Sequence, residues 1–122
     1  MSILLERHKL PLTLNVGRQR GEWARRRELA DWREWAAKEA AGLPCIPGTV
    51  SVIVTHLRKT RASLPDVGSP MLAVKAIIDG VVDAGVLPED GPSVVRRLVF
   101  EAPLVVGFHG LRVEVLEDGA VH

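Results

Sequence analysis

Residues 64–92 constrain the fold of this chain more than any other stretch, because they set acidic loops on both sides of one amphipathic helix. Ser69 and Pro70 predict its start, since a serine hydroxyl can accept a hydrogen bond from a free amide of the first turn and proline is tolerated at the first helical position. Gly85 is expected to end it. Two stripes lie between these marks, an apolar one of Met71, Val74, Ile78, Val81 and Val82 and a polar one of Lys75, Asp79 and Asp83.

Acidic residues occupy the loops on both sides of this helix. Asp66 precedes it, and Glu89 and Asp90 follow it, each in a loop interrupted by proline and glycine. A helix of about 15 residues is about 22 Å long. The two loops therefore meet only if the chain doubles back, or if Asp90 lies beside the face that carries Lys75.

Length and composition set broad limits. The 122 residues predict a single domain, residues 1–122, with a core of ordinary size. The net charge of +1 does not indicate a polyanion-binding protein, so any contact with DNA has to come from local clusters. Cys45 is the single cysteine and is interpreted as a small residue in a connector, which favours a reducing, cytoplasmic setting. No apolar run approaches the ~20 residues of a membrane span, so we expect no membrane association.

The rest of the chain predicts one more long helix and four strands. The helix is rich in Ala, Glu, Arg and Leu, and the run TVSVIVTHL is typical of a central strand. A turn is expected at Pro103–Gly110 and a frayed tail at Glu117–His122. The elements are a strand at His8–Asn15, a helix at Glu22–Ala41, and strands at Thr49–Leu57, Val94–Glu101 and Leu111–Leu116. This order predicts the α+β class, with a mixed sheet of about four strands and two main helices packed on it.

Two basic clusters are candidates for phosphate contact. One, at the start of the long helix, is close to acids that offer ion pairs at i,i+3 or i,i+4, so an ordinary solvated face is the alternative. The other, Arg58–Arg61, directly precedes the acidic loop at Asp66, where cations would guide a phosphate to a metal held by acids. The first cluster is Arg18, Arg20, Arg25, Arg26 and Arg27, and its neighbouring acids are Glu22, Glu28, Asp31 and Glu34.

Five further residues each have a structural and a functional interpretation. Trp32 and Trp35 lie on the apolar stripe of the long helix and are assigned to the core. For Trp23, among arginines near the helix start, core packing and a stacking platform both stay open. His56, near the end of the central strand, is interpreted as structural, with a metal-ligand or general-base role as the alternative. Asn15 either ends the first strand or contacts the substrate.

Two segments carry a family resemblance. The run VKAIIDGVVDAGVLPEDGP, residues 74–92, resembles the second half of the RusA-type Holliday-junction resolvases, and PLTLN, residues 11–15, looks like the Pro-rich first strand of that family. In the family a helix lysine leads to a loop with a metal-binding aspartate, an Asp-x-Asp-Asn motif precedes the helix, and three aspartates together bind magnesium. Position by position, Lys75 matches the family lysine, Asp90 the loop aspartate and Asp66 the first aspartate of the motif.

The resemblance implies an enzyme with a specific set of residues. It would be a magnesium-dependent, structure-specific endodeoxyribonuclease that resolves Holliday junctions or other branched DNA as a homodimer in the cytoplasm, the host cytoplasm if a phage encodes it. Mn²⁺ is the alternative cation. Asp66, Lys75 and Asp90 would be catalytic, Asp66 and Asp90 would bind the metal, and DNA contacts would come from Asn15, Arg18, Arg20, Arg58, Lys59 and Arg61.

The chain departs from the family in its acidic motif. Gly68 stands where the second aspartate is expected, and Ser69 where the asparagine is expected. Glu89, Asp79 or a backbone carbonyl near Gly68 would have to complete the metal site. Two other interpretations therefore stay open, namely a RusA-like domain that binds DNA or a protein without cutting, and a small interaction domain with no nucleic-acid role.

Overall fold

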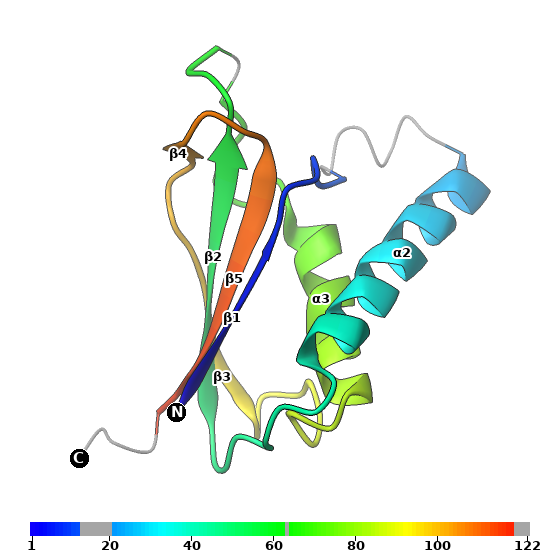
Figure 1. Cartoon of the computed structure of the whole chain (residues 1–122), viewed down its shortest axis with the longest axis vertical. Helices are drawn as coiled ribbons and strands as arrows, with labels where there is room; N and C mark the ends of the chain where they lie inside the picture. Colours follow the sequence, from blue (N-terminus) through cyan, green and yellow to red (C-terminus); the bar gives the residue numbers. More distant parts are fainter. Residues whose placement is uncertain (13–20, 63, 119–122) are drawn as a thin grey trace.

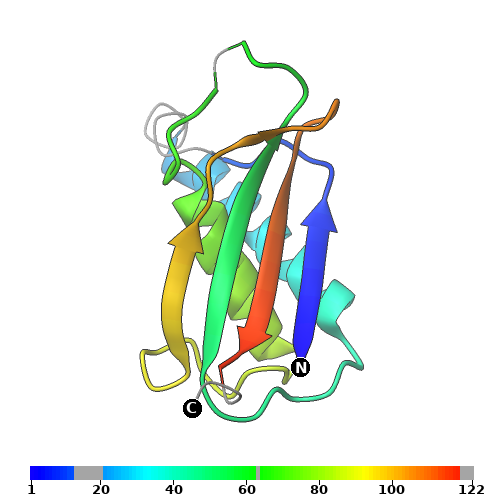
Figure 2. The ribbon, with the colours of Figure 1, turned by 90° about the vertical axis from the view of Figure 1, so that its left-hand side faces the viewer.

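The computed structural model describes residues 1–12, 21–62 and 64–118, and it shows a five-stranded mixed sheet with two helices packed on one face (Figure 1). The α+β class and the mixed sheet predicted from the sequence are confirmed. Figure 2 views the other face, where the strands lie in front of both helices. The elements are β1 (Ser2–Arg7), α2 (Glu22–Ala40), β2 (Val50–Arg58), α3 (Met71–Asp83), β3 (Val95–Phe100), β4 (Leu104–Val105) and β5 (Gly110–Glu117).

β2 lies at the centre of the sheet, whose strand order is β1-β5-β2-β3. It pairs antiparallel with β5 and parallel with β3 and β4. Parallel neighbours need a crossover connection, and α3 lies in the crossover between β2 and β3. Val50, Val52 and Val54 are each no more than 1% exposed. The central strand predicted at Thr49–Leu57 is thus confirmed.

The first strand lies earlier in the chain than predicted. It spans Ser2–Arg7 and pairs with β5 from Ser2 opposite Leu116 to Arg7 opposite Leu111. Residues 8–12 of the predicted strand His8–Asn15 are not a strand, and residues 13–15 lie outside the described residues. Pro11 has no amide hydrogen to donate to a sheet, whereas Ile3 and Leu5 alternate inward as a half-buried strand requires. Leu4, which is 60% exposed, obscured that alternation in the sequence.

Two segments predicted to be irregular belong to the sheet. Within the predicted turn Pro103–Gly110, Leu104 and Val105 form β4 opposite Leu57 and Arg58 of β2. Glu117, predicted as tail, is the last residue of β5, and its carboxylate lies 3.0 Å from the amino group of Met1.

The two helices differ in composition because they differ in burial. α2 has 19 residues, many of them charged, and buries only Trp32, Ala36 and Ala40. α3 has 13 residues and buries seven of them, since it packs against both the sheet and α2. Within the described residues, neither helix is both long enough and apolar enough to cross a bilayer.

Gly80 lets α2 and α3 approach each other closely. A Cβ atom at this position would lie 2.3 Å from the carbonyl oxygen of Arg33 and 2.8 Å from the Cβ of Ala36. Because α2 has small side chains here, the two backbones nearly touch. The polar face of α3 is therefore held in a fixed position relative to α2.

The boundaries of α3 match the prediction at one end only. Gly85 has φ +82°, and its amide donates to the Val82 carbonyl at 2.9 Å, so the predicted stop is confirmed. At the other end Pro70 is the cap and no side chain caps the helix, so the predicted serine cap is wrong. The Ser69 hydroxyl is buried without a hydrogen-bond partner among the described residues. Met71, assigned to the apolar stripe, is 38% exposed.

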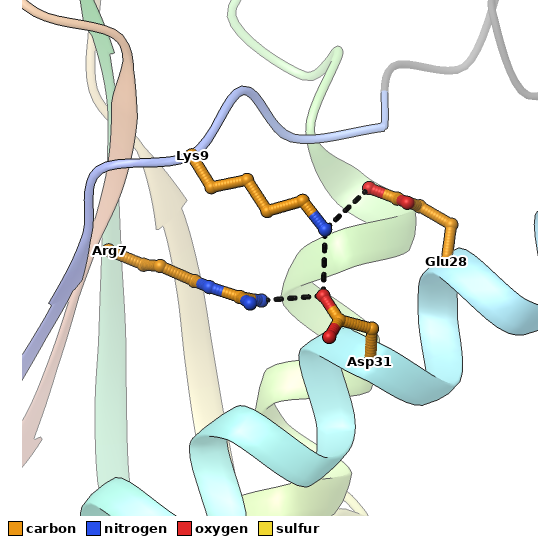
Figure 3. Close-up of polar contacts among 4 residues, drawn as sticks. All are labelled: Arg7, Lys9, Glu28 and Asp31. Atoms are coloured by element: carbon orange, nitrogen blue, oxygen red, sulfur yellow. Dashed lines mark hydrogen bonds and ion pairs between the residues drawn. The ribbon is translucent and has the colours of Figure 1, made fainter.

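Ion pairs tie the end of β1 to α2 (Figure 3). Asp31 accepts from Arg7 at 2.9 Å and from Lys9 at 2.7 Å, and Lys9 also lies 3.3 Å from Glu28. Hydrogen bonds from Lys9 and then Arg7 lower the pKa of Asp31. The alternative to phosphate contact had both acids pairing with arginines of their own helix, whereas they pair with Arg7 at the end of β1 and with Lys9 after it.

Candidate functional site

Lys75 projects from the second turn of α3 into a hollow of about 300 Å³. The side chain is exposed, and residues from three separate segments surround it. The hollow is lined by Lys75 and Ile78 of α3, Asp90 and Pro92 of the following loop, and Val95 and Leu98 of β3. The structure therefore brings together the predicted lysine and the predicted loop aspartate. Of the two arrangements considered from the sequence, it shows the one in which Asp90 lies beside the face of α3 that carries Lys75.

The loop after α3 owes its path to buried anchors and turn bonds. Val86 and Leu87 are 0% and 1% exposed, and the Val86 carbonyl accepts a hydrogen bond from the Ile46 amide at 2.9 Å. The Gly91 carbonyl accepts from the amides of Val94 and Val95 at 3.0 and 2.9 Å. With both of its ends fixed, the loop turns Asp90 back towards the middle of α3.

Glu89 serves the structure of that same loop. Its Oε1 atom accepts a hydrogen bond from the Ser93 hydroxyl. A carboxylate that already bonds within its own loop is less available as the third metal ligand considered from the sequence.

Asp79 lies beside Asp90 and completes a small polar group with Lys75. Burial is the main cause of the raised pKa of Asp79, and its hydrogen-bonding interaction with the Asp90 carboxyl is the second. Arg33 and Lys75 act in the opposite direction. Two neighbouring carboxylates repel each other when both are ionised, so a cation bound between them would be stabilising.

A second hollow of about 450 Å³ lies on the other side of Lys75, between α2 and α3. Arg33 of α2 lines it together with Asp79, and the Arg33 guanidinium also bonds both carboxylate oxygens of Asp83, at 2.7 and 2.9 Å. This contact lowers the pKa of Asp83. The lining residues are Leu29, Ala30, Arg33, Leu72, Lys75, Ala76 and Asp79. Arg33 was not singled out in the sequence, because only the packing of α2 on α3 brings it here.

Asp66 belongs to the turn before α3. Its side chain is exposed, and its backbone carbonyl accepts a hydrogen bond from the Ser69 amide at 3.0 Å. No group of three or more His, Cys, Asp or Glu side chains able to hold a metal exists within residues 1–12, 21–62 and 64–118, so Asp66 does not join Asp79 and Asp90. A Cβ built on Gly68 would contact nothing within 4 Å, so the turn has room for the carboxylate that this position lacks.

The basic run lies at the end of the sheet opposite to the Asp90 loop, as both ribbon views show (Figures 1 and 2). Arg58 ends β2, and the Lys59 amide donates to Nδ1 of His109 at 3.3 Å. Arg61 is exposed in the segment that follows. The other residues predicted to contact DNA, Asn15, Arg18 and Arg20, lie outside the described residues.

His56 faces the core. It is 1% exposed, and neither ring nitrogen has a hydrogen-bond partner in the described part of the chain. Burial, followed by the nearby charges of Arg58 and His109, lowers the pKa of His56 to about 4. The ring is therefore neutral at physiological pH, which is typical of a structural histidine.

The polar group can hold one divalent cation through two carboxylates. Mg²⁺ takes oxygen ligands, and in phosphate chemistry one or two protein carboxylates are joined by water and substrate oxygens. Asp79 and Asp90 provide that number of carboxylates, and Lys75 adds a positive charge for a phosphate. A site of three aspartates of the kind the resemblance implies is not present among the described residues.

Comparison with known proteins gives no family assignment. No protein-family model matches the chain, and no curated protein matches it significantly.

Proposed function

We propose that the chain is a RusA-like, magnesium-dependent endodeoxyribonuclease that cuts branched DNA such as a Holliday junction. The observation that carries the proposal is the hollow that Lys75 and Asp90 share, with the Asp79 carboxyl beside Asp90. The resemblance of residues 74–92 to the family supplies the substrate class, and the two carboxylates next to an ammonium group supply the chemistry.

Asp79 and Asp90 would hold the cation, which when bound would polarise a phosphodiester and lower the pKa of a coordinated water. Mg²⁺ is the expected ion and Mn²⁺ an alternative. Asp79 is included because its carboxyl group interacts with that of Asp90, and it is one of the groups that the sequence offered to complete the metal site.

The remaining chemistry belongs to residues of this chain. The Lys75 ammonium lines the same hollow as Asp90, so it can stabilise negative charge on the phosphate or on the leaving oxygen. The Asp90 carboxylate, which lines the same hollow as Lys75, can also accept a hydrogen bond from a water molecule and orient it. Arg33 lies beyond Asp79 and adds positive charge on the side of α2.

A second candidate is a RusA-like domain that binds branched DNA without cutting it. It is favoured by Gly68, since this residue removes a carboxylate that the family uses. In either case the family resemblance leads us to propose a homodimer in the cytoplasm. Analytical ultracentrifugation of the purified chain tests the dimer directly.

Incubation with a synthetic four-way DNA junction tests the proposal. We expect nicking that requires Mg²⁺ or Mn²⁺, and a loss of about 100-fold or more in Asp90→Asn, because the substitution removes a charged ligand. Glu39→Gln is the matched control, since it removes one acid from the exposed surface of α2, away from the hollow. Circular dichroism of each variant checks that the fold is kept.

Three outcomes separate the candidates. Metal-dependent nicking that Asp90→Asn abolishes and Glu39→Gln retains supports the nuclease. Junction binding that weakens with salt and survives Asp90→Asn, without nicking by the wild type, supports the binding domain. If the wild type binds neither branched nor duplex DNA at low salt, both proposals are rejected.

A further inference from the structure

Trp23 is the exposed tryptophan of the described chain. It is the second residue of α2 and 69% exposed, whereas Trp32, on the same helix, is 0% exposed and Trp35 is half-buried. Trp32 and Trp35 pack edge to face in the core, with ring centroids 5.7 Å apart. Burial of an indole stabilises a fold, so a side chain of this size left in water has a large apolar surface available for a ligand.

Arg27 covers one face of this indole. Its guanidinium carbon lies 4.1 Å from the centroid of the Trp23 ring, one helical turn along α2. A guanidinium stacked on an aromatic ring restricts the rotamers of both side chains. The contact therefore orients the indole in advance and leaves its second face to solvent.

The surroundings of Trp23 carry a surplus of positive charge. Arg25 and Arg26 both contact Glu22, at 2.8 and 3.1 Å. The first turns of α2 thus have three consecutive arginines against Glu22 and Glu28, and Glu28, which lines a hollow with Arg27, also lies 3.3 Å from Lys9. A polyanion gains from such a patch, whereas an uncharged partner does not.

The patch leads towards Lys75. Ala30 is seven residues after Trp23 and Arg33 is ten after it, which places all three on one side of α2 by helical periodicity. Ala30 and Arg33 line the 450 Å³ hollow together with Lys75. An extended strand that contacts Trp23 can therefore follow α2 to the group of Lys75, Asp79 and Asp90.

We propose that Trp23 and Arg27 form a stacking platform for an unpaired base of single-stranded DNA, with Arg26, on the same side of α2, contacting an adjacent phosphate. This inference rests on the proposed function in so far as the strand continues to Lys75. The combination of a flat aromatic face with surplus arginines is what single-stranded nucleic acids require, since bases stack on the ring and phosphates neutralise the cations. Arg27 contributes both stacking and charge to the platform, because its stacked guanidinium can also reach a phosphate oxygen.

Binding of a fluorescein-labelled oligothymidylate of about 20 nucleotides, measured by anisotropy at low salt, tests the platform. EDTA is present, so that neither metal nor cleavage contributes. We expect Trp23→Ala to weaken binding about 5- to 100-fold, and Trp23→Phe to retain most of the affinity because a phenyl ring still stacks. Arg27→Ala should weaken binding more than Lys38→Ala, a matched loss of one cation at the other end of α2, where Lys38 pairs with Glu34.

Tryptophan fluorescence gives a readout that a purely structural role would not move. Stacking of thymine on Trp23 should quench the wild-type emission, and the quenching should be absent in Trp23→Phe. Equal quenching in both proteins would contradict the proposal, as would wild-type affinity in Trp23→Ala. A wild type that does not bind the oligothymidylate but self-associates in sedimentation, with the self-association abolished by Trp23→Ala, would reject the platform. The surface around Trp23 would then be a protein interface.

The two proposals fail separately. Loss of oligothymidylate binding in Trp23→Ala, together with a wild type that never nicks a junction, leaves the platform standing and rejects the nuclease. Nicking that depends on Asp90, together with unchanged oligothymidylate binding in Trp23→Ala, rejects the platform and leaves the nuclease standing.

Discussion

The two acidic loops that flank α3 differ in how the protein holds them. The loop after α3 is anchored by the buried residues Val86 and Leu87, and it brings Asp90 to Asp79 and Lys75. The turn before α3 exposes both Leu64 and Asp66, and its acid stays outside that group. The comparison indicates that a carboxylate becomes part of a site when apolar neighbours fix its loop, and that similar spacing in the sequence does not ensure it.

The largest effect should come from removing the anchor of the second loop. Leu87→Ala deletes a side chain that is 1% exposed and should lower the free energy of unfolding by about 2–5 kcal/mol. Leu64→Ala is the matched change in the first loop, where the side chain is 46% exposed, and should cost less than about 0.5 kcal/mol. Urea unfolding followed by circular dichroism measures both. Equal losses would mean that the two loops are held alike.

A smaller effect is expected at Lys75, which tests whether this side of α3 is the working side. Lys75→Ala should reduce nicking of a four-way junction about 100-fold, because a positive charge next to the phosphate is lost. Folding stability should hardly change, since the side chain is exposed. Lys38→Ala, which removes a lysine from α2, is the control. Undiminished nicking in Lys75→Ala would place the chemistry elsewhere.

The elements that depend on local pattern were predictable from the sequence. One burial pattern underlies each of three elements: the β-branched run of β2, the alternation in β5 and the apolar stripe of α2. Gly85 ends α3 because the chain adopts a left-handed conformation there. β1 was placed too late, because Leu4 is apolar although it faces water and breaks the alternation. Ser69 did not cap α3, because Pro70 takes that position and the hydroxyl is buried.

The candidate site was predictable only in part. Lys75 and Asp90 were identified from their resemblance to a family pattern, and the structure brings them to one hollow. Asp79 was one of three groups that the sequence offered to complete the site, and the choice among them depends on the path of the loop between Gly85 and Val95. Arg33 enters the site only through the close contact at Gly80, which no pattern within α2 encodes.

The pH dependence of stability should distinguish Asp79 from Asp66. Because the pKa of Asp79 is raised in the folded protein, the folded state binds its proton more tightly than the unfolded state does. Stability should therefore fall as the pH rises from about 4 through the raised pKa of Asp79. Asp79→Asn removes this fall, so the variant should melt higher than the wild type at neutral pH and the same as the wild type in strong acid. Asp66→Asn is the comparison, and a similar gain there would contradict the assignment of the carboxyl pair.

The smallest effect is expected from restoring an acid to the first loop. Gly68→Asp is sterically allowed, since a Cβ there meets nothing within 4 Å. We expect at most a few-fold gain in Mn²⁺ affinity, as the turn that holds residue 68 is separate from Asp79 and Asp90. Isothermal titration calorimetry measures it. A gain of 100-fold or more would mean that the two loops meet in solution.

Mn²⁺ binding, followed by the loss of the free-ion signal in electron paramagnetic resonance, tests most directly whether Asp79 and Asp90 form the cation site. The wild type and Asp66→Asn should bind Mn²⁺ alike, whereas Asp79→Asn and Asp90→Asn should each weaken binding at least 10-fold, since each removes one of two carboxylate ligands. Weakened binding in Asp66→Asn with unchanged binding in Asp79→Asn would contradict the account.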